Sequence, residues 1–452
     1  MMSDEAKVGS YKLDITPKKK IELYALENKY RSSSKIFSKL FINTIFIQNK
    51  KNKVLFITLD LIYVGDKFCE DIKKIIKNKY NINERNILIN ATHTHSSPLI
   101  ENNVLNPAKV NSSYIKFLRR KVLISVAKSI KQKSNCKILT SSKKIDLNLN
   151  RRKKVLNLEE LKKFRFKNHF ANRPNFNGPK DDDLSFLKFV TNKNQVKCMI
   201  INYACHPSLI RDNVVSSDYP GFIRSNIEKH YSKKITICFL LGFCGNLKAN
   251  LIYKTKFNWK YPIKSFYHLI FDNFHFKKKL SLDEVKKFSK KISNLIIGED
   301  NYTEITPSIK CKLEKIKVQF KKYSLEKIFK KNKHNLNYQV KRYLDLLKRN
   351  KNKNYKILTV QKISLSKNLT FLSLSGEVFC EYSIWLKQLA SKKNILVIPV
   401  SCANGLMGYL STRKALNEGG YEVDRILIEH GMPTTFEESI ESNVKMAIEK
   451  IF

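Results

Sequence analysis

Asn90–Pro98 reads NATHTHSSP and directly follows the apolar run Ile87–Ile89. Such a run predicts a buried β-strand, and side chains in extended backbone alternate between the two faces of a sheet. His93 and His95 are therefore expected to point the same way from the end of that strand. Two imidazoles aimed at one point indicate a metal site or a proton-transfer site. The alternative is one hydrogen-bonded core histidine beside one surface histidine, and the spacing alone leaves both interpretations open.

The chain before this motif alternates strand and helix patterns. Val54–Leu61 is rich in β-branched residues, Lys67–Lys79 has the apolar spacing of a helix, and Ile87–Ala91 is the strand that delivers the histidines. This alternation predicts an α/β fold, with a mixed β-sheet core flanked by helices and the functional site at strand ends. Asp60, near the end of the first run, is either a structural carboxylate or a group that orients a metal-binding histidine.

Three later apolar runs end in the same way, in side chains that bind metals. The predicted strands are 195–204, 370–374 and 395–400, and the residues that follow them are His206, Glu377 and Tyr409. Imidazole nitrogens and a carboxylate form a hydrolytic zinc site when one coordination position stays open to water. Because a sheet brings the carboxyl ends of its strands to one edge, these residues are expected to meet His93 there.

Two loops between these strands carry further candidate residues. Asp218 lies in SSDYPGF, where a helix is expected to begin. The loop GFCGN contains Gly245 and Asn246, and its glycines would let backbone N–H groups approach a ligand. By contrast, residues 152–179 are basic and irregular and are expected to form a surface loop, and 258–297 has a helical pattern.

The strong positive charge is a less specific signal. The chain has 86 Lys and Arg against 39 Asp and Glu, a formal net charge of +47. The excess is mostly lysine, dispersed along the chain and accompanied by much Asn and Ile, as an AT-rich genome would produce. Because no nucleic-acid-binding motif accompanies it, we expect no specific nucleic-acid partner. A basic nucleic-acid-binding protein remains the least favoured alternative, and a lysine-covered surface allows transient contact with anionic membranes.

Cysteine usage and hydropathy bear on the cell compartment. The nine cysteines form no CxxC pair and are odd in number, which favours a reduced, intracellular protein. No signal peptide is visible at the N-terminus, and no run approaches 18 apolar residues. We therefore expect a cytoplasmic protein without a transmembrane segment.

Taken together, the motifs resemble those of the neutral/alkaline non-lysosomal ceramidases, zinc-dependent amidases that cleave the N-acyl bond of ceramide. In family order, the matching stretches are DITP, NATHTHSSP, NLNR, DLSFLKF, ACHPS, SSDYPGF, GFCGN, SGE, ANGLMGYL and GGYEV. They extend over nearly the whole chain. The resemblance implies one catalytic domain over 1–452, with a mainly helical insertion at 251–355 and without the C-terminal immunoglobulin-like domain of the ceramidases.

The resemblance also implies roles for single residues. One zinc ion per chain would be bound by His93, His206, Glu377 and Tyr409, and the scissile carbonyl would be surrounded by His95, Arg151 and Tyr421. A zinc-activated water would be the nucleophile. The three groups around the carbonyl would stabilise the developing oxyanion, and His95 or a nearby carboxylate would act as general base.

One departure from the family pattern concerns the glycine loop. Ceramidases read GDVSPN there, whereas this chain reads GNLKAN at 245–250, so Lys248 replaces a serine that has been assigned to catalysis. A lysine does not replace a hydroxyl nucleophile in this reaction. The expected function is a zinc-dependent hydrolase of linear amide bonds, acting on N-acyl sphingosine or another N-acyl lipid or amide. The alternative is a catalytically silent zinc-containing binding protein of the same fold.

Overall fold

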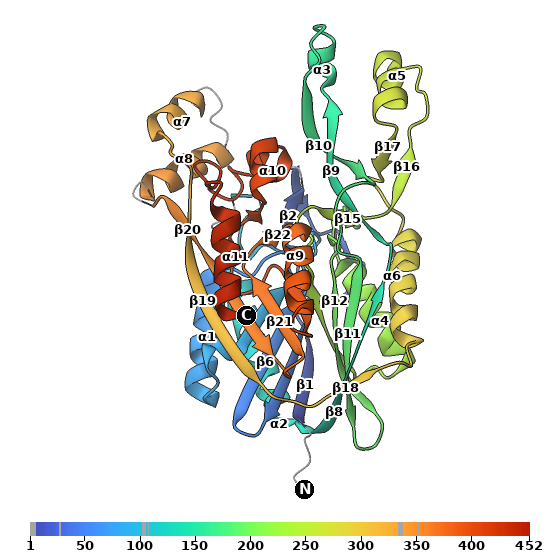
Figure 1. The fold of residues 1–452 in the computed structure, drawn as a ribbon, viewed down its shortest axis with the longest axis vertical. Coiled ribbons are helices and arrows are strands. Elements are labelled where there is room, and N and C mark those ends of the chain that lie inside the picture. The colour runs from blue at the N-terminus through green and yellow to red at the C-terminus, as the bar shows by residue number, and fades with distance from the viewer. Residues whose placement is uncertain (1–5, 27–28, 102–104, 107, 333–337, 351–352) are drawn as a thin grey trace.

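The structure, a computed structural model, describes residues 6–26, 29–101, 105–106, 108–332, 338–350 and 353–452 (Figure 1). A nine-stranded mixed sheet forms its largest part. In sheet order its strands are β14 (Thr236–Leu241), β12 (Val196–Tyr203), β11 (Asp183–Thr191), β8 (Ser134–Lys144), β1 (Ala6–Asp14), β5 (Phe41–Asn49), β6 (Asn52–Leu59) and β7 (Ile87–Ala91), with β18 (Thr303–Ile305) paired to β8. A second sheet has the order β19 (Lys310–Gln319), β20 (Tyr355–Ser364), β21 (Leu369–Leu374) and β23 (Leu396–Val400).

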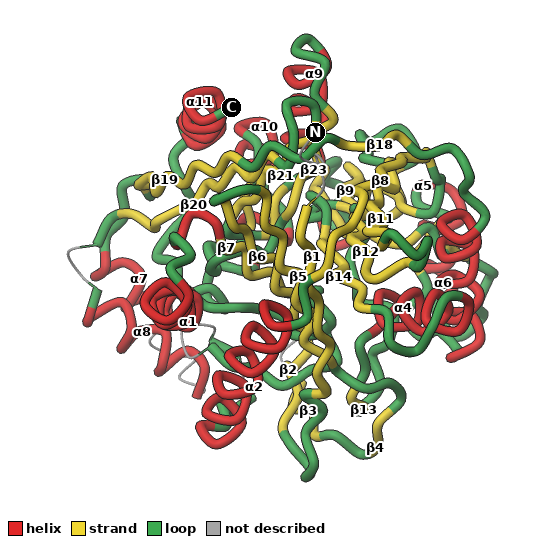
Figure 2. The backbone as a smooth tube through the Cα atoms, turned by 90° about the horizontal axis from the view of Figure 1, so that it is seen from below, coloured by secondary structure: helices red, strands yellow, loops and turns green. Residues whose placement is uncertain are grey.

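The two sheets pack face to face between two helix layers. Phe56 of the large sheet meets Phe371 of the second sheet at 4.9 Å between ring centroids. The other face of the large sheet is covered by α1 (Asp66–Tyr80), α2 (Ser112–Lys131), α4 (Asp218–His230) and α6 (Leu282–Ile297). The outer face of the second sheet is covered by α9 (Cys380–Ser391) and α11 (Ile440–Ile451). Figure 2 shows the strands at the centre with helices around them, which confirms the expected α/β fold.

Coiling of the large sheet brings its two edges together. β7 and β12 lie near opposite ends of the strand order, yet β14 contacts β5, β6 and β7. The second sheet joins these edges, because the amide of Ser401 donates to Leu241 O at 2.8 Å and that of Ala91 donates to Cys402 O at 3.1 Å. The ends of β7, β14 and β23 therefore gather at one place, as strand twist accumulated over many strands allows.

The main helices have clear local signals. α1 begins with Asp66 in its first turn, has basic residues in its last turn, and ends at Asn81 in the left-handed conformation with φ 50°. α6 begins with a capping box between Ser281 and Glu284. Both helices bury one apolar face against the large sheet, and this burial supplies most of their stability.

The expected surface loop at 152–179 is wrong, because these residues form a hairpin. β9 (Asn148–Leu156) pairs antiparallel with β10 (Asn168–Asn175), and α3 (Leu158–Leu161) lies at its tip. Lysine and arginine in the strands hid the β pattern, because the sequence does not show which of these side chains are buried: Arg152 is buried and pairs with Glu418 and Glu422. The helical pattern at 258–297 is also divided: α5 (Pro262–Phe271) sits between β16 (Ile252–Lys254) and β17 (Phe274–Phe276), and α6 follows.

The segment 251–355 holds four helices in its described part, and it is not separate from the sheets. Besides α5 and α6 it contains α7 (Leu325–Asn332) and α8 (Tyr338–Arg349), but β19 belongs to the second sheet. Shorter elements complete the chain: β2 (Glu22–Leu26), β3 (Lys29–Ser32), β4 (Lys35–Ile36), η1 (Glu84–Asn86), β13 (Val214–Val215), β15 (Leu247–Ala249), β22 (Glu377–Val378), β24 (Tyr409–Leu410), α10 (Arg413–Glu418) and η2 (Tyr421–Arg425). Across the residues described, no helix combines the length and apolar character needed to cross a bilayer.

Candidate functional site

The histidine loop begins where β7 ends, at Ala91. His93 has φ 65°, so the backbone turns there and does not continue as the expected extended strand. Its amide donates to Leu61 O at 2.8 Å, and its Nδ1 lies 2.8 Å from Ile62 O. Because a carbonyl only accepts, Nδ1 carries the proton and Nε2 presents a lone pair to the centre of the site. The ring of His95 still faces the same centre, 5.0 Å from that of His93.

His206 follows β12 and meets the first histidine. Its Nε2 lies 3.2 Å from Nε2 of His93, and its Nδ1 lies 3.5 Å from Cys244 O. The backbone links the two histidine loops, because the amide of His95 donates to Pro207 O at 3.3 Å. Residues 113 positions apart along the chain are thus held in contact by the strand ends that the coiled sheet brings together.

Glu377 completes the centre from the second sheet's side. It begins β22 and is the register partner of Tyr409 in β24. Its Oε2 lies 3.3 Å from Nε2 of His93 and 3.8 Å from Nε2 of His206. Its Oε1 accepts a hydrogen bond of 3.0 Å from the hydroxyl of Tyr63. Two imidazole nitrogens and one carboxylate oxygen therefore converge on one buried point.

This donor set fits a metal ion. Ligands at about 2.0–2.1 Å from a tetrahedral zinc ion stand about 3.3 Å from one another, close to the separations among His93, His206 and Glu377. Oε2 of Glu377 has no hydrogen-bond donor among the described residues, as expected of an oxygen that would coordinate a cation. His95 offers a second possible set, because ligand atoms of His93, His95 and His206 all lie within 4.8 Å of one another.

The electrostatics of the centre suit metal binding and proton transfer. Burial, helped by the charge of Arg151, lowers the pKa of His206 well below its ordinary value. Burial and the neighbouring His93 do the same to the pKa of His95. Burial alone would raise the pKa of Glu377, but the two facing histidines outweigh it and hold that pKa well below the usual range. Burial alone would lower the pKa of His93, but Cys402 and Glu377 raise it well above its ordinary value. His95 and His206 are therefore neutral, whereas His93 and Glu377 form a charged pair in which a metal ion would take the place of the His93 proton.

Arg151 is fixed beside this centre by three hydrogen bonds. It extends from β9 and is 3% exposed. Its Nε donates to Glu422 Oε1 at 2.8 Å, and its Nη2 donates to Gly245 O at 2.6 Å and to the hydroxyl of Tyr409 at 3.0 Å. The ring of Tyr421 lies 5.9 Å from the guanidinium carbon. Arg151 therefore lies beside Tyr421, with which it was expected to surround the carbonyl, and it also contacts Tyr409, the expected fourth metal ligand.

The glycine loop lies behind these groups, and the amides of both of its glycines donate to backbone carbonyls and not to a ligand. A Cβ on Gly245 would lie 2.5 Å from Glu377 O, so glycine is required by close packing. Its amide donates to Val378 O at 2.7 Å. Asn246 accepts from the amide of Cys380 at 2.9 Å and donates to Glu381 at 2.7 Å, which anchors the start of α9.

The two candidate aspartates support loops. Asp60 pairs with Arg224 at 2.9 Å and accepts from the hydroxyl of Thr92 at 3.3 Å, so it braces the residue before His93 and not an imidazole. The ring of His93 is oriented by the carbonyl of Ile62 and not by Asp60. Asp218 accepts from the amides of Leu209 and Ile210 at 3.0 and 2.9 Å and shapes the loop that follows His206.

A cavity of about 490 Å³ opens over the histidines. His95, His206, Arg151, Tyr409 and Tyr421 line it, with apolar contributions from Phe170, Ile426 and Ile428. Lys248 of β15 also lines it, with its Nζ 5.0 Å from the ring centre of Phe276. Among the described residues that line the cavity, Glu429 is the single acidic residue, against several arginines and Lys248. The cavity is therefore polar and mainly cationic.

Four residues of the site were missed by the sequence reasoning. Besides Tyr63 and Glu422 these are Glu429, whose pKa burial raises to about 7, and His430, whose Nε2 lies 4.0 Å from Glu377 Oε1. Glu422 stands next to Tyr421 in GGYEV, so that motif could have identified it. Tyr63 stands two residues after the predicted strand Val54–Leu61, so the strand-end pattern could have identified it, whereas Glu429 and His430 follow no motif or strand end.

A second cluster of metal-binding side chains is less suited to a cation. Ligand atoms of His268, Asp272 and His275 lie within 4.8 Å of one another. However, the carboxylate of Asp272 already pairs with Arg173 at 2.6 Å and Lys153 at 3.2 Å. A metal ion there would compete with two positive charges for one carboxylate.

The chain matches one known protein family in sequence and solved structures in fold. The model of the N-terminal region of neutral/alkaline non-lysosomal ceramidases matches residues 7–260, more than half of the chain. The neutral ceramidase from Pseudomonas aeruginosa has a similar solved structure, with a TM-score of 0.70 at 14% identity over 98% of this chain and 73% of that one. A ceramidase complexed with C2 has a TM-score of 0.69 at 14% identity over 99% and 76%. No curated protein sequence matches the chain.

At 14% identity the solved structures establish the fold alone, and the family model establishes membership. Neutral ceramidases are hydrolases of an amide bond, so membership implies a hydrolase. The chain belongs to the neutral/alkaline non-lysosomal ceramidase family.

Proposed function

We propose that the protein is a metal-dependent hydrolase of linear N-acyl amide bonds. The observation that carries the proposal is the convergence of His93 Nε2, His206 Nε2 and Glu377 Oε2 beside the buried guanidinium of Arg151. These three residues, with Tyr409 as the fourth, would hold one zinc ion per chain. A bound zinc ion supplies Lewis acidity, which polarises a carbonyl and lowers the pKa of water towards about 7.

The residues around the centre stabilise charge on the amide oxygen. Arg151 stays protonated, and its bonds to Glu422 and Gly245 O hold it still before a substrate arrives. A preorganised donor of this kind costs no reorganisation when charge develops on the carbonyl oxygen. We assign Arg151, the hydroxyl of Tyr421 and His95 to this role.

Amide hydrolysis also moves two protons, one from the attacking water and one to the leaving nitrogen. His95 is neutral and both of its ring nitrogens lack hydrogen-bond partners among the described residues, so it can accept a proton. Glu429 lines the same cavity with a pKa of about 7, the range in which a general base is most effective. We assign Glu429 to accept the proton of the attacking water. His95, which lines the same cavity, takes up that proton and donates it to the leaving nitrogen as the C–N bond breaks, so the amine receives the proton that the water loses.

The cavity bears on the class of substrate. Its described lining is polar beside the histidines, so a polar group is expected next to the scissile amide, and its volume of about 490 Å³ is too small to enclose a long acyl chain as well. We therefore propose an N-acyl amphiphile, such as N-acyl sphingosine or another N-acyl lipid amide, whose chain extends out of the cavity.

Release of fatty acid from a panel of N-acyl substrates tests the proposal. The wild-type protein with zinc should hydrolyse at least one of them, and Arg151→Ala should reduce kcat by about 10²–10³-fold without loss of metal. Absence of turnover across the panel by the metal-loaded, folded protein would contradict it.

A second candidate function is metal-dependent binding without catalysis, and Lys248 is the observation that favours it. Its ammonium lines the cavity at the position where ceramidases have a serine. If the metal-loaded wild-type protein is silent and Lys248→Ser restores hydrolysis, the second candidate holds. If both hydrolyse the same substrates, Lys248 contributes to binding only.

A further inference from the structure

We infer that the end of the molecule that carries the two protruding hairpins docks on an anionic lipid bilayer. The first prong is the hairpin 153–173 around α3, and the second prong is the hairpin 252–276 around α5. In Figure 1 both project beyond the body at the same end of the molecule. The inference adds a surface to the proposed function but does not depend on the chemistry of the site.

The prongs concentrate the exposed apolar surface of the protein. Ten of the 17 large hydrophobic side chains that are exposed in the described chain lie on them. Phe164 and Phe166 on the first prong are 93% and 78% exposed, and Trp259 on the second is 85% exposed. Contiguous exposed apolar surface of this kind marks an interaction site in a folded protein.

The exposed residues of α5 form a regular stripe. Ile263, Phe266 and Ile270 are spaced i, i+3 and i+7 and are 69%, 62% and 56% exposed, whereas Ser265 and Tyr267 are buried. A globular helix normally turns such a stripe towards its own core. Here the apolar face points outward, as in helices that lie in the interface of a membrane.

Charge on the same prongs selects among possible partners. The stretch 252–279 carries seven lysines and a single acidic residue, Asp272, and that carboxylate is occupied by Arg173 and Lys153. A second copy of this face would bring like charges together in a symmetric dimer, which is unfavourable. Lysine beside exposed aromatic residues matches the surface of a bilayer that contains anionic lipids.

A cationic cavity of about 750 Å³ lies between the prongs. The first prong contributes Arg173, and the second contributes Lys254, Lys256 and Lys264. Lys248 also lines it, and no Asp or Glu does so among the described residues. This cavity shares Arg173 and Lys248 with the cavity over the histidines. Anionic head groups would therefore be attracted to a place that adjoins the site.

The two prongs are held to each other, so the face exists before any partner arrives. Arg173 of the first prong pairs with Asp272 of the second at 2.6 Å. The hydroxyl of Tyr267 donates to Leu156 O, and the rings of Phe176 and Phe274 meet edge to face at 5.3 Å. Phe164 at the tip has φ 54°, a strained backbone for a bulky residue, although its side chain is 93% exposed.

Trp259 provides a direct test, because the chain has two tryptophans and Trp385→Phe leaves Trp259 as the only one. Emission from Trp259 is measured in the full-length protein with vesicles of phosphatidylcholine alone and of equal parts phosphatidylcholine and phosphatidylglycerol. We expect a shift to shorter wavelength with the anionic vesicles, and quenching by lipids brominated on their acyl chains. Unchanged emission with the anionic vesicles at low salt would overturn the inference.

Matched variants separate insertion from general attraction between lysines and lipids. Phe266→Ser should weaken vesicle binding by about tenfold, whereas Met446→Ser, at 57% exposure on α11, should not. Lys264→Glu should weaken it by about fivefold, and Lys193→Glu in the β11–β12 turn should not. Equal binding by Phe266→Ser and wild type would overturn the inference. The inference would also be overturned if the emission of Trp259 shifted without vesicles while the protein self-associated.

The outcome is independent of the proposed hydrolase activity. Vesicle binding is measured without substrate, and hydrolysis of a soluble short-chain N-acyl amide is measured without vesicles. Loss of one with retention of the other shows which of the two proposals is wrong.

Discussion

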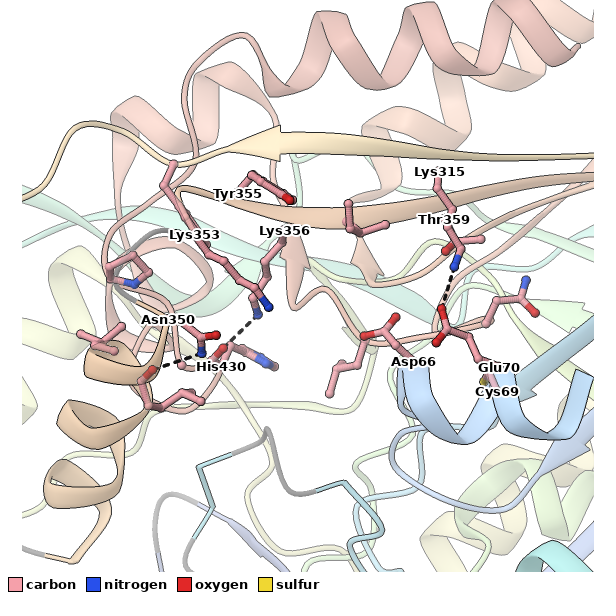
Figure 3. A pocket seen from close by; sticks show the side chains of 18 of the residues that line it. Asp66, Cys69, Glu70, Lys315, Asn350, Lys353, Tyr355, Lys356, Thr359 and His430 are labelled. Carbon is pink, nitrogen blue, oxygen red and sulfur yellow. Dashed lines mark hydrogen bonds and ion pairs between the residues drawn. The ribbon is translucent and has the colours of Figure 1, made fainter. Parts of the chain in front are cut away.

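Two cavities of almost equal volume meet at residues 429 and 430. Glu429 lines the cavity of about 490 Å³ over the histidines, and His430 lines a second cavity of about 500 Å³ (Figure 3). The second cavity holds carboxylates and ammonium groups together. Lys315 donates to Glu70 at 2.7 Å, and Lys356 donates to the carbonyl of His430 at 2.9 Å.

Both cavities hold a histidine whose buried ring nitrogens have no hydrogen-bond partner among the described residues, His95 in the first and His430 in the second. The cavity over the histidines differs because His95 lies within ligand distance of His93 and His206. Both ring nitrogens of His95 and Oε2 of Glu377 lack hydrogen bonds within the described chain. Buried polar groups are normally satisfied, so these exceptions require an explanation. The comparison shows that neither cavity volume nor a single unsatisfied histidine locates the chemistry here, whereas a cluster of ligand-type side chains that face one another does.

Among the variants that test this comparison, removal of a metal ligand should have the largest effect on activity. His206→Ala removes one of the two imidazoles present in both possible ligand sets, so we expect loss of the metal and a fall in kcat/KM of about 10³-fold or more. The measurement is turnover of an N-acyl substrate together with metal content. A variant that keeps full activity would place the reaction elsewhere.

His95→Ala distinguishes the two ligand sets. If Glu377 and Tyr409 complete the site, this variant keeps its metal and loses about 10²–10³-fold in kcat, because His95 acts on the substrate. Loss of metal from His95→Ala, with metal retained by Tyr409→Phe, would instead favour the three-histidine set.

The pH dependence of the rate tests Glu429. Its pKa of about 7 means that the carboxylate accumulates above that pH, so kcat/KM should rise as pH increases through about 7. Glu429→Gln should abolish this rise and cost about 10²-fold. Tyr24→Phe is the matched control. The hydroxyl of Tyr24 donates to Glu429 and lowers the pKa of that carboxyl, so its removal should move the rise in kcat/KM to higher pH. An unchanged pH profile of kcat/KM in Glu429→Gln would show that Glu429 takes no part in proton transfer.

The smallest effect is expected in the second cavity. Glu70→Gln breaks an ion pair whose side chains are 48% and 58% exposed, and such pairs contribute less than about 1 kcal/mol to stability. Turnover should equal that of the wild type, and urea denaturation should show the small change in free energy of unfolding. A clear loss of turnover would mean that the two cavities are coupled.

Much of the fold could be predicted from the sequence because the apolar runs are strong. β7 has the predicted bounds, and α1 extends one residue beyond its predicted range at each end. The hairpin of β9 and β10 was missed because its lysine and arginine side chains mask the alternation of a strand. The coiling that brings β7 and β12 together depends on contacts between residues far apart in the chain, which no local pattern encodes.

The candidate site was predictable where ligand-type residues follow strands. His93, His206 and Glu377 were identified in this way and lie together in the structure. Asp60 has the same pattern but pairs with Arg224, since a sequence does not show which charge a buried acid will meet. Glu429 and His430 lie in a turn whose sequence carries no periodic signal, so only the folded chain brings them to the site.

Elemental analysis of the purified wild-type protein tests the central claim most directly. The account predicts one tightly bound zinc ion per chain, which His93→Ala loses and Glu70→Gln keeps. Wild-type protein that is folded and active on an N-acyl amide without any stoichiometric metal would contradict it.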